Sequence, residues 1–132
     1  MQKKKNQEAL TFLTERYNNI KPNIYRTYDF ANFLRNSEEY KKSIKLYSNI
    51  LLKISDKHKL YSKILDKRGI AYERSDQWDL AEKDLLNSLK MFPDEPYVMN
   101  YLAYSWVEKG KNINKALAML RKANNLKKMM VT

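Results

Sequence analysis

Residues 68 to 85 read RGIAYERSDQWDLAEKDL and place a glycine inside a stretch that is otherwise helical. Apolar residues recur here three and four positions apart, as on one face of an α-helix. A glycine inside a helix costs about 1 kcal/mol relative to alanine. Two helix backbones approach closely only where the side chains between them are small. We therefore expect Gly69 and Ala81 to lie where two helices cross, with Tyr72 and Leu85 filling the space beside them.

The same pattern of small and large residues occurs three times along the chain. In each copy a small residue is followed by a large residue four positions later and by a further residue seven positions later. The three sets are Ser43, Tyr47 and Ile50; Ala81, Leu85 and Ser88; and Ala116, Leu120 and Ala123. A matching segment precedes each set and holds the pairs Ala31 and Leu34, Gly69 and Tyr72, and Ala103 and Trp106. A period of 20 to 50 residues is typical of stacked repeats. The sequence thus predicts helical hairpins packed side by side.

Short polar stretches interrupt the helical pattern and divide the chain into elements. They predict about seven helices, near residues 6–20, 24–37, 40–54, 59–74, 77–91, 95–109 and 113–127. The chain has only two glycines and three prolines, which argues against a hairpin-rich β architecture. The expected fold class is all-α.

These residues resemble the tetratricopeptide repeat (TPR) family. Residues 62–95 match its pattern best, through Leu65, Gly69, Tyr72, Ala81, Leu85, Ser88 and Pro93. Residues 96–130 follow it as a third repeat, and residues 24–57 are a divergent first repeat. The resemblance is to TPR proteins common in alphaproteobacteria, and it implies a short right-handed α-solenoid forming one structural domain.

The two ends of the chain differ from complete repeats. Residues 1–23 are expected to form an N-terminal helix, either a cap or the remnant of an earlier repeat, because Ala9 and Leu13 repeat the second-helix pattern. The resemblance implies a further repeat after residue 130, so we expect the chain to be truncated. The last hairpin would then leave an apolar surface that promotes self-association. This surface would contain Met119, Leu126 and Met129.

The resemblance also implies a function and a site. In this family the first helix of each repeat lines a concave groove that binds a protein or peptide. Carried over position by position, the groove residues are Tyr25, Tyr28, Asn32, Arg35, Lys63, Asp66, Ile70, Glu73, Tyr97, Asn100 and Tyr104. Tyrosine faces supply contact area and amide groups hold a peptide backbone. Asp66 and Glu73 stand where a clamp for a C-terminal carboxylate would need cations, which argues against that ligand.

Composition leaves little for catalysis or metal binding. The chain has no cysteine and one histidine, His58, so thiol nucleophiles, thiolate zinc sites and histidine-paired triads are excluded. We expect no enzyme activity, no metal and no cofactor. Ser75 or Asp76 is expected to cap the helix that follows. Asp79, Glu82 and Asp84 are expected on a solvated face.

The net charge of +11 leaves two alternatives open beside the scaffold. Residues 1–61 carry 13 basic and 6 acidic side chains, residues 62–95 carry 6 and 8, and residues 96–132 carry 7 and 1. The first alternative is a basic helical protein that associates with nucleic acid, which the acidic middle disfavours. The second is a degenerate repeat fragment without a dedicated partner. No apolar run is long enough to span a membrane, and we expect a cytoplasmic bacterial protein.

Overall fold

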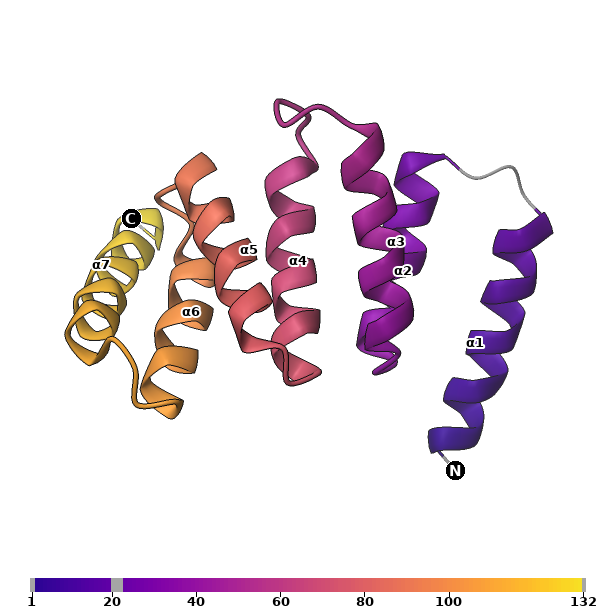
Figure 1. Ribbon diagram of the computed structural model, residues 1–132, viewed down its shortest axis with the longest axis horizontal. Coiled ribbons are helices and arrows are strands. Elements are labelled where there is room, and N and C mark those ends of the chain that lie inside the picture. Colours follow the sequence, from indigo (N-terminus) through magenta and orange to yellow (C-terminus); the bar gives the residue numbers. More distant parts are fainter. Residues whose placement is uncertain (1, 20–22, 132) are drawn as a thin grey trace.

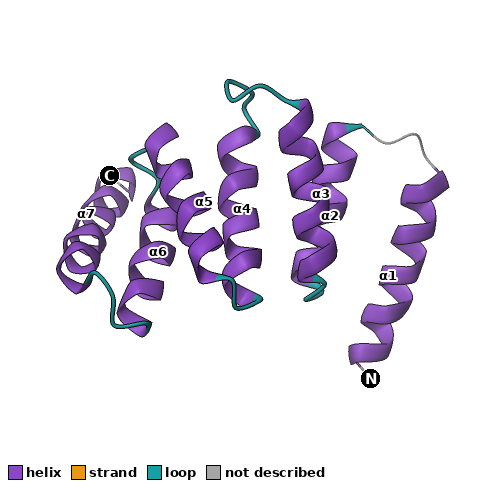
Figure 2. Cartoon of the chain, viewed as in Figure 1, coloured by secondary structure: helices purple, strands orange, loops and turns teal. Residues whose placement is uncertain are grey.

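The computed structural model describes residues 2–19 and 23–131, and in this part of the chain the regular structure is seven helices laid side by side (Figure 1). No strand is present among these residues (Figure 2). The helices are α1 (Gln2–Asn19), α2 (Ile24–Asn36), α3 (Tyr40–Lys53), α4 (Tyr61–Arg74), α5 (Trp78–Met91), α6 (Pro96–Glu108) and α7 (Ile113–Val131). The all-α prediction is confirmed. Residues 1 and 20–22 of the expected N-terminal unit lie outside the described residues.

Three pairs of consecutive helices form the hairpins α2–α3, α4–α5 and α6–α7, which pack within themselves more extensively than against one another. We call α2, α4 and α6 the first helices and α3, α5 and α7 the second helices. The small residues Ser43, Ala81 and Ala116 are completely buried, one in each second helix. Burial at the same position of every hairpin agrees with the repeat period. The unit boundaries themselves stay a prediction.

Gly69 lies at the crossing of α4 and α5, as the sequence predicts. A Cβ atom at this position would lie 3.1 Å from Cγ of Leu85 and 3.3 Å from the carbonyl oxygen of Ala81. Both distances are shorter than an ordinary van der Waals contact between carbon and its neighbours. The glycine therefore allows the two backbones to approach, and Leu85 fills the space that a side chain would occupy.

The turn inside each hairpin has the same hydrogen-bond pattern. After α2, the Glu38 N–H donates to the Arg35 carbonyl at 3.0 Å and the Glu39 N–H donates to the Leu34 carbonyl at 2.8 Å. This pair of bonds defines a Schellman motif, which needs a left-handed residue after the helix. The same two bonds recur after α4 and after α6, and the left-handed residues are Glu38, Asp76 and Gly110, with φ of 64°, 62° and 64°.

The expected cap of α5 is wrong. Gln77 occupies the N-cap position and, within the described part of the chain, makes no side-chain capping bond. Asp76 is the left-handed residue of the turn, and the Ser75 hydroxyl donates to the Ala71 carbonyl at 2.8 Å. Both side chains thus belong to the end of α4. Asp79 does lie in the first turn of α5, where a negative charge is favourable.

Asp84 and Glu82 are not on a solvated face, contrary to expectation. Asp84 is 3% exposed and receives two hydrogen bonds from Arg68, at 2.7 and 2.8 Å. Arg68 also donates to the Ser48 hydroxyl at 3.1 Å, so the pair joins α3, α4 and α5. Glu82 accepts a hydrogen bond of 2.7 Å from Nε1 of Trp106 and thereby joins α5 to α6.

The apolar core has two parts. One lies between the first hairpin and α4 and contains Ala31, Tyr47, Ile50, Leu60 and Ile64. The other lies under α5, α6 and α7 and contains Leu85, Val98, Leu102, Ala103, Trp106 and Ala116. The Arg68 and Asp84 pair lies between them. No helix among the described residues is long and apolar enough to cross a bilayer.

Candidate peptide-binding groove

The first helices share a polar cavity of about 230 Å³. Arg35 and Asn36 reach it from the end of α2, Ile70 and Arg74 from α4, and Tyr97 and Tyr101 from α6, with Glu38 and Tyr40 at its edge. We call the surface around this cavity, formed by α2, α4 and α6, the first-helix groove. The walls of this cavity come from all three hairpins, so a side chain that enters it can contact all three.

The predicted groove residues fall into three classes. Tyr25, Lys63, Tyr97 and Tyr104 are exposed; Tyr28, Asn32, Arg35, Asp66, Glu73 and Asn100 are partly buried; and Ile70 is buried. Arg35, Ile70 and Tyr97 line the same cavity. The exposed tyrosines are the ones with area available to a partner, since 54% of Tyr97 and 59% of Tyr104 is accessible to solvent.

The predicted residues of α2 are held in place by Tyr47 of α3. The Tyr47 hydroxyl donates to Oδ1 of Asn32, and Arg35 donates to the Tyr47 oxygen at 2.9 Å and to Asn32 at 3.2 Å. The Tyr28 ring packs on the Tyr47 ring with centroids 6.4 Å apart. Burial raises the pKa of both tyrosines, so their hydroxyls stay protonated at neutral pH. Of this cluster Arg35 lines the cavity, and its hydrogen bonds to Tyr47 and Asn32 fix its position there.

Asp66 is a carboxylate with little compensation for its burial. Its side chain is 13% exposed, its nearest cation is Lys67 at 4.0 Å, and Oδ1 has no hydrogen-bond partner among the described residues. Burial raises the pKa of Asp66 from 3.8 to about 6, although Lys67 and Arg35 act in the opposite direction. Asp66 therefore changes its charge close to physiological pH.

Glu73 and Tyr101 form the opposite wall. The Tyr101 hydroxyl donates to Glu73 at 3.1 Å, and Lys109 lies 3.8 Å from the same carboxylate. Burial and the Glu73 charge together raise the pKa of Tyr101 to about 12. Lys67 lies over the Tyr97 ring, 5.4 Å from its centroid, as in a cation–π contact. The groove therefore combines tyrosine faces with cations and bound carboxylates.

Five lining residues of this cavity were missed by sequence reasoning: Asn36, Glu38, Tyr40, Arg74 and Tyr101. Tyr40 is the first residue of a second helix, and a search restricted to first helices does not include it. Arg74 directly follows the predicted position Glu73, and Tyr101 directly follows Asn100. A search that included the next residue along each first helix would have found both.

No metal centre is visible in the part of the chain that the structure describes. Residues 2–19 and 23–131 contain no cluster of three or more histidine and acidic side chains that could hold a metal ion. Nδ1 of His58 accepts a hydrogen bond from the Leu60 N–H at 3.1 Å, and its ring lies 6.1 Å from that of Tyr25. This histidine orders the loop before α4.

No known family profile matches the sequence, and no curated protein matches it significantly. Solved structures do match the fold. A structure of MamA superimposes with a TM-score of 0.75 at 13% identity, over 96% of this chain and 71% of that one. A structure of MamA MSR-1 superimposes with a TM-score of 0.73 at 20% identity, over 95% of this chain and 69% of that one. Both are structures of tetratricopeptide-repeat proteins.

The chain folds as a tetratricopeptide-repeat protein. A structure of the CopN–Scc3 complex matches as well, with a TM-score of 0.62 at 14% identity over 84% of this chain and 73% of that one. At these identities the likeness concerns the fold.

Proposed function

We propose that this tetratricopeptide-repeat protein is a non-catalytic scaffold that binds a protein or peptide segment in the first-helix groove. The observation that carries the proposal is the shared cavity, in which Arg35, Ile70 and Tyr97 from three successive hairpins meet. The exposed rings of Tyr97 and Tyr104 extend the contact surface along α6. Large, rigid aromatic side chains bind a partner with a small loss of conformational entropy.

The neighbouring structures support a protein partner. The CopN–Scc3 structure is a complex between proteins, and its fold is shared by this chain. The alternative of nucleic-acid binding draws support from the net charge of +11. However, the middle of the chain carries 8 acidic and 6 basic residues, and a nucleic-acid site requires a continuous basic face. A protein or peptide fits the groove better.

The test is affinity capture from the source cells at about 150 mM and about 500 mM salt. The wild type is compared with the double variant Tyr97→Ala, Tyr104→Ala, whose sites are exposed, and with Leu52→Ala as an exposed control on α3. We expect one discrete protein at both salt concentrations with the wild type and the control, and its loss with the double variant. If only nucleic acid or acidic proteins are captured and all are lost at high salt, the proposal fails.

A further inference from the structure

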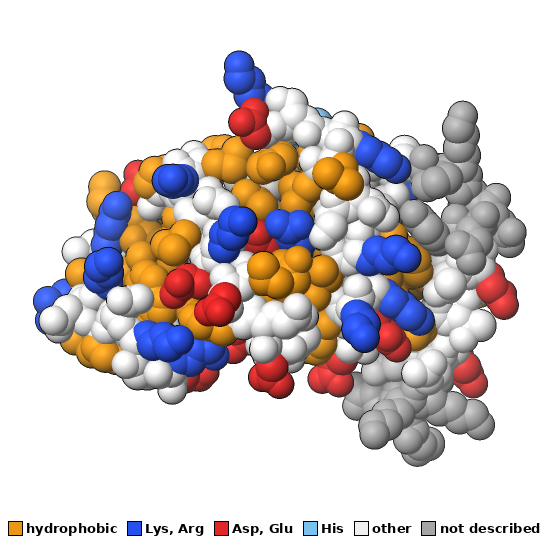
Figure 3. Space-filling view, viewed as in Figure 1, with side chains coloured by type: hydrophobic (Ala, Val, Ile, Leu, Met, Phe, Trp, Pro, Cys, Tyr) orange, Lys and Arg blue, Asp and Glu red, His pale blue; other side chains and the backbone are white. Residues whose placement is uncertain are grey.

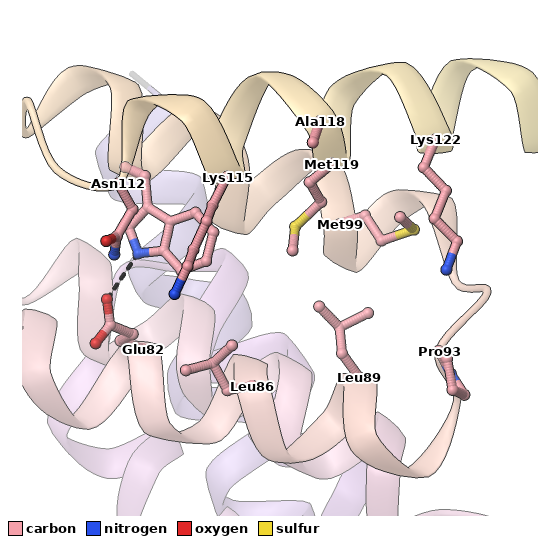
Figure 4. A pocket seen from close by; sticks show the side chains of 11 residues that line it. Glu82, Leu86, Leu89, Pro93, Met99, Asn112, Lys115, Ala118, Met119 and Lys122 are labelled. Carbon is pink, nitrogen blue, oxygen red and sulfur yellow. Dashed lines mark hydrogen bonds between the residues drawn. The ribbon is translucent and has the colours of Figure 1, made fainter.

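A second groove lies on the other side of the molecule, between α5 and α7. It has a volume of about 640 Å³ and is lined chiefly by apolar side chains. Leu86 and Leu89 come from α5 and Ala118 and Met119 from α7, with Met99 of α6 between them (Figure 4). The buried Trp106 of α6 also lines the groove and forms its floor with Met99. Leu86 is 40% exposed. We call this surface the second-helix groove; it shares no lining residue with the first-helix groove.

In the preceding hairpin, the surface that corresponds to the second-helix groove contains charged side chains. Arg68 and Asp84 line the space beside α4 and α5 and are tied to α3 through Ser48. In the sequence repeat, Leu102 and Met119 take the places of Arg68 and Asp84. The cavity beside α4 and α5 is smaller, about 370 Å³, and contains an ion pair where the next hairpin has apolar side chains. The second-helix groove presents an apolar surface where the preceding hairpin presents a charged pair.

Cations border this groove along α7. Lys115 and Lys122 both line it and are seven residues apart, which places them two turns apart on one face of the helix. Residues 113–131 contain five basic side chains and no acidic one. The one carboxylate in the lining, Glu82, is hydrogen-bonded to Trp106. Lys122 lies 3.5 Å from the carboxylate of Asp94, and both side chains of this pair are exposed, so an acidic residue of a partner would compete with Asp94 for this lysine. Figure 3 shows apolar side chains over this end of the molecule, with Lys and Arg side chains around them and Asp and Glu side chains beside them.

We propose that the second-helix groove binds an amphipathic helix of a partner protein, with an apolar stripe flanked by acidic residues two turns apart. The stripe would contact Leu86, Leu89 and Met119, and the acidic residues would face Lys115 and Lys122. Charge complementarity selects this occupant over a second copy of the chain, because two molecules of charge +11 repel each other. The inference is independent of the function proposed for the first-helix groove.

The test uses a synthetic helical peptide of about 18 residues, with leucines at helical spacing and two glutamates two turns apart. Trp106 in the floor of the groove reports binding by fluorescence, in a Trp78→Phe background that removes the second tryptophan. We expect a saturable change in Trp106 fluorescence with this peptide. A control peptide in which glutamine replaces both glutamates should bind about tenfold more weakly. The double variant Lys115→Glu, Lys122→Glu should reverse the preference between acidic and lysine-containing peptides.

Two further variants locate the site. Leu86→Lys, at an exposed position, should abolish the titration, whereas Tyr97→Ala with Tyr104→Ala should leave it unchanged. Circular dichroism confirms that each variant is folded. Equal affinity for the glutamate and glutamine peptides, or binding that Leu86→Lys does not affect, would overturn the proposal. Sedimentation that shows a dimer lost on Leu86→Lys would assign the groove to a second copy and overturn it as well.

Discussion

At the scale of single residues, Gly69 is the position where the size of one side chain decides how two helices pack. Leu85 and the Ala81 carbonyl leave no room for a larger residue. We predict that Gly69→Leu lowers the free energy of unfolding by about 3 kcal/mol through overpacking. Gly69→Ala should change it by less than about 1 kcal/mol, because the gain in helix propensity opposes the close contact. Urea denaturation measures both, and an unchanged midpoint for Gly69→Leu would contradict the packing described here.

Glu38 has the left-handed conformation that glycine has in the third hairpin. In this conformation a residue with a Cβ atom is strained by about 1–2 kcal/mol, and glycine removes that strain. Glycine also makes the unfolded chain more flexible, which offsets part of the gain in stability. We predict that Glu38→Gly raises the free energy of unfolding by about 0.5–1 kcal/mol. Gly110→Ala, the reverse change at φ of 64°, should lower it by about 1 kcal/mol. Opposite shifts in melting temperature check the pair, and shifts of the same sign would refute it.

Asp66 makes the stability depend on pH. Its pKa is raised from 3.8 to about 6, so the folded state holds its proton over a range in which the unfolded state has lost it. Stability should therefore fall as the pH rises from about 4 to about 6 and then level off. We predict that Asp66→Asn stabilises the protein by up to about 3 kcal/mol at pH 7 and has little effect at pH 4. Denaturant titrations across this range check it, and a gain that is equal at both pH values would exclude this carboxylate as the cause.

At the scale of elements, the ion pair of Arg68 and Asp84 holds three helices together. Removing Arg68 alone would leave a buried, unpaired carboxylate. We predict that Arg68→Leu lowers the free energy of unfolding by about 3–5 kcal/mol, and that the double variant Arg68→Leu, Asp84→Met recovers most of the loss. The double variant copies the residues of the third hairpin. A double-mutant cycle measures the coupling, and simple additivity of the two changes would contradict a direct pair.

Much of the element order could be predicted from the sequence, for a physical reason. The small residues Ser43, Ala81 and Ala116 are spaced by the repeat, and helix boundaries follow from local breaks such as the turn at Gly110. The partners of Asp84 and Glu82 could not be predicted, because Arg68 and Trp106 lie 16 and 24 residues away and only the fold brings them together. A buried carboxylate and a solvated one look alike in a helical pattern.

The candidate site could be predicted in part. The resemblance to tetratricopeptide repeats assigns Arg35, Ile70 and Tyr97 to one groove, although they lie at different positions of their repeats, and the three residues do line one cavity. The hydrogen bonds that hold the side chains of Asn32 and Arg35 could not be predicted, because they involve the Tyr47 hydroxyl from the neighbouring helix. Tyr28, which packs on Tyr47, is consequently a poor position for a binding variant, because its loss would also disturb the first core.

At the scale of the whole molecule, the chain presents two different surfaces. The first-helix groove has tyrosine rings and the carboxylate of Glu73, which accepts a hydrogen bond from Tyr101, whereas the second-helix groove is apolar and bordered by lysine. Each hairpin contacts mainly its neighbours, so a solenoid of this kind can offer both surfaces at once without a large rearrangement of its core. The self-association expected from Met119, Leu126 and Met129 stays an untested prediction, and Met129 is 72% exposed. It competes with the partner helix proposed for the second-helix groove, because Met119 lines that groove.

The most direct test of the central claim is site-specific photo-crosslinking in the source cells. A photoreactive phenylalanine analogue replaces Tyr97 or Tyr104 in the first-helix groove. In the control variant the same analogue replaces Leu52, which is 86% exposed on α3. We predict that both groove positions crosslink to the same protein and that position 52 does not. Identical crosslinks from all three positions, or none from the groove, would contradict the assignment of this face as a protein-binding site.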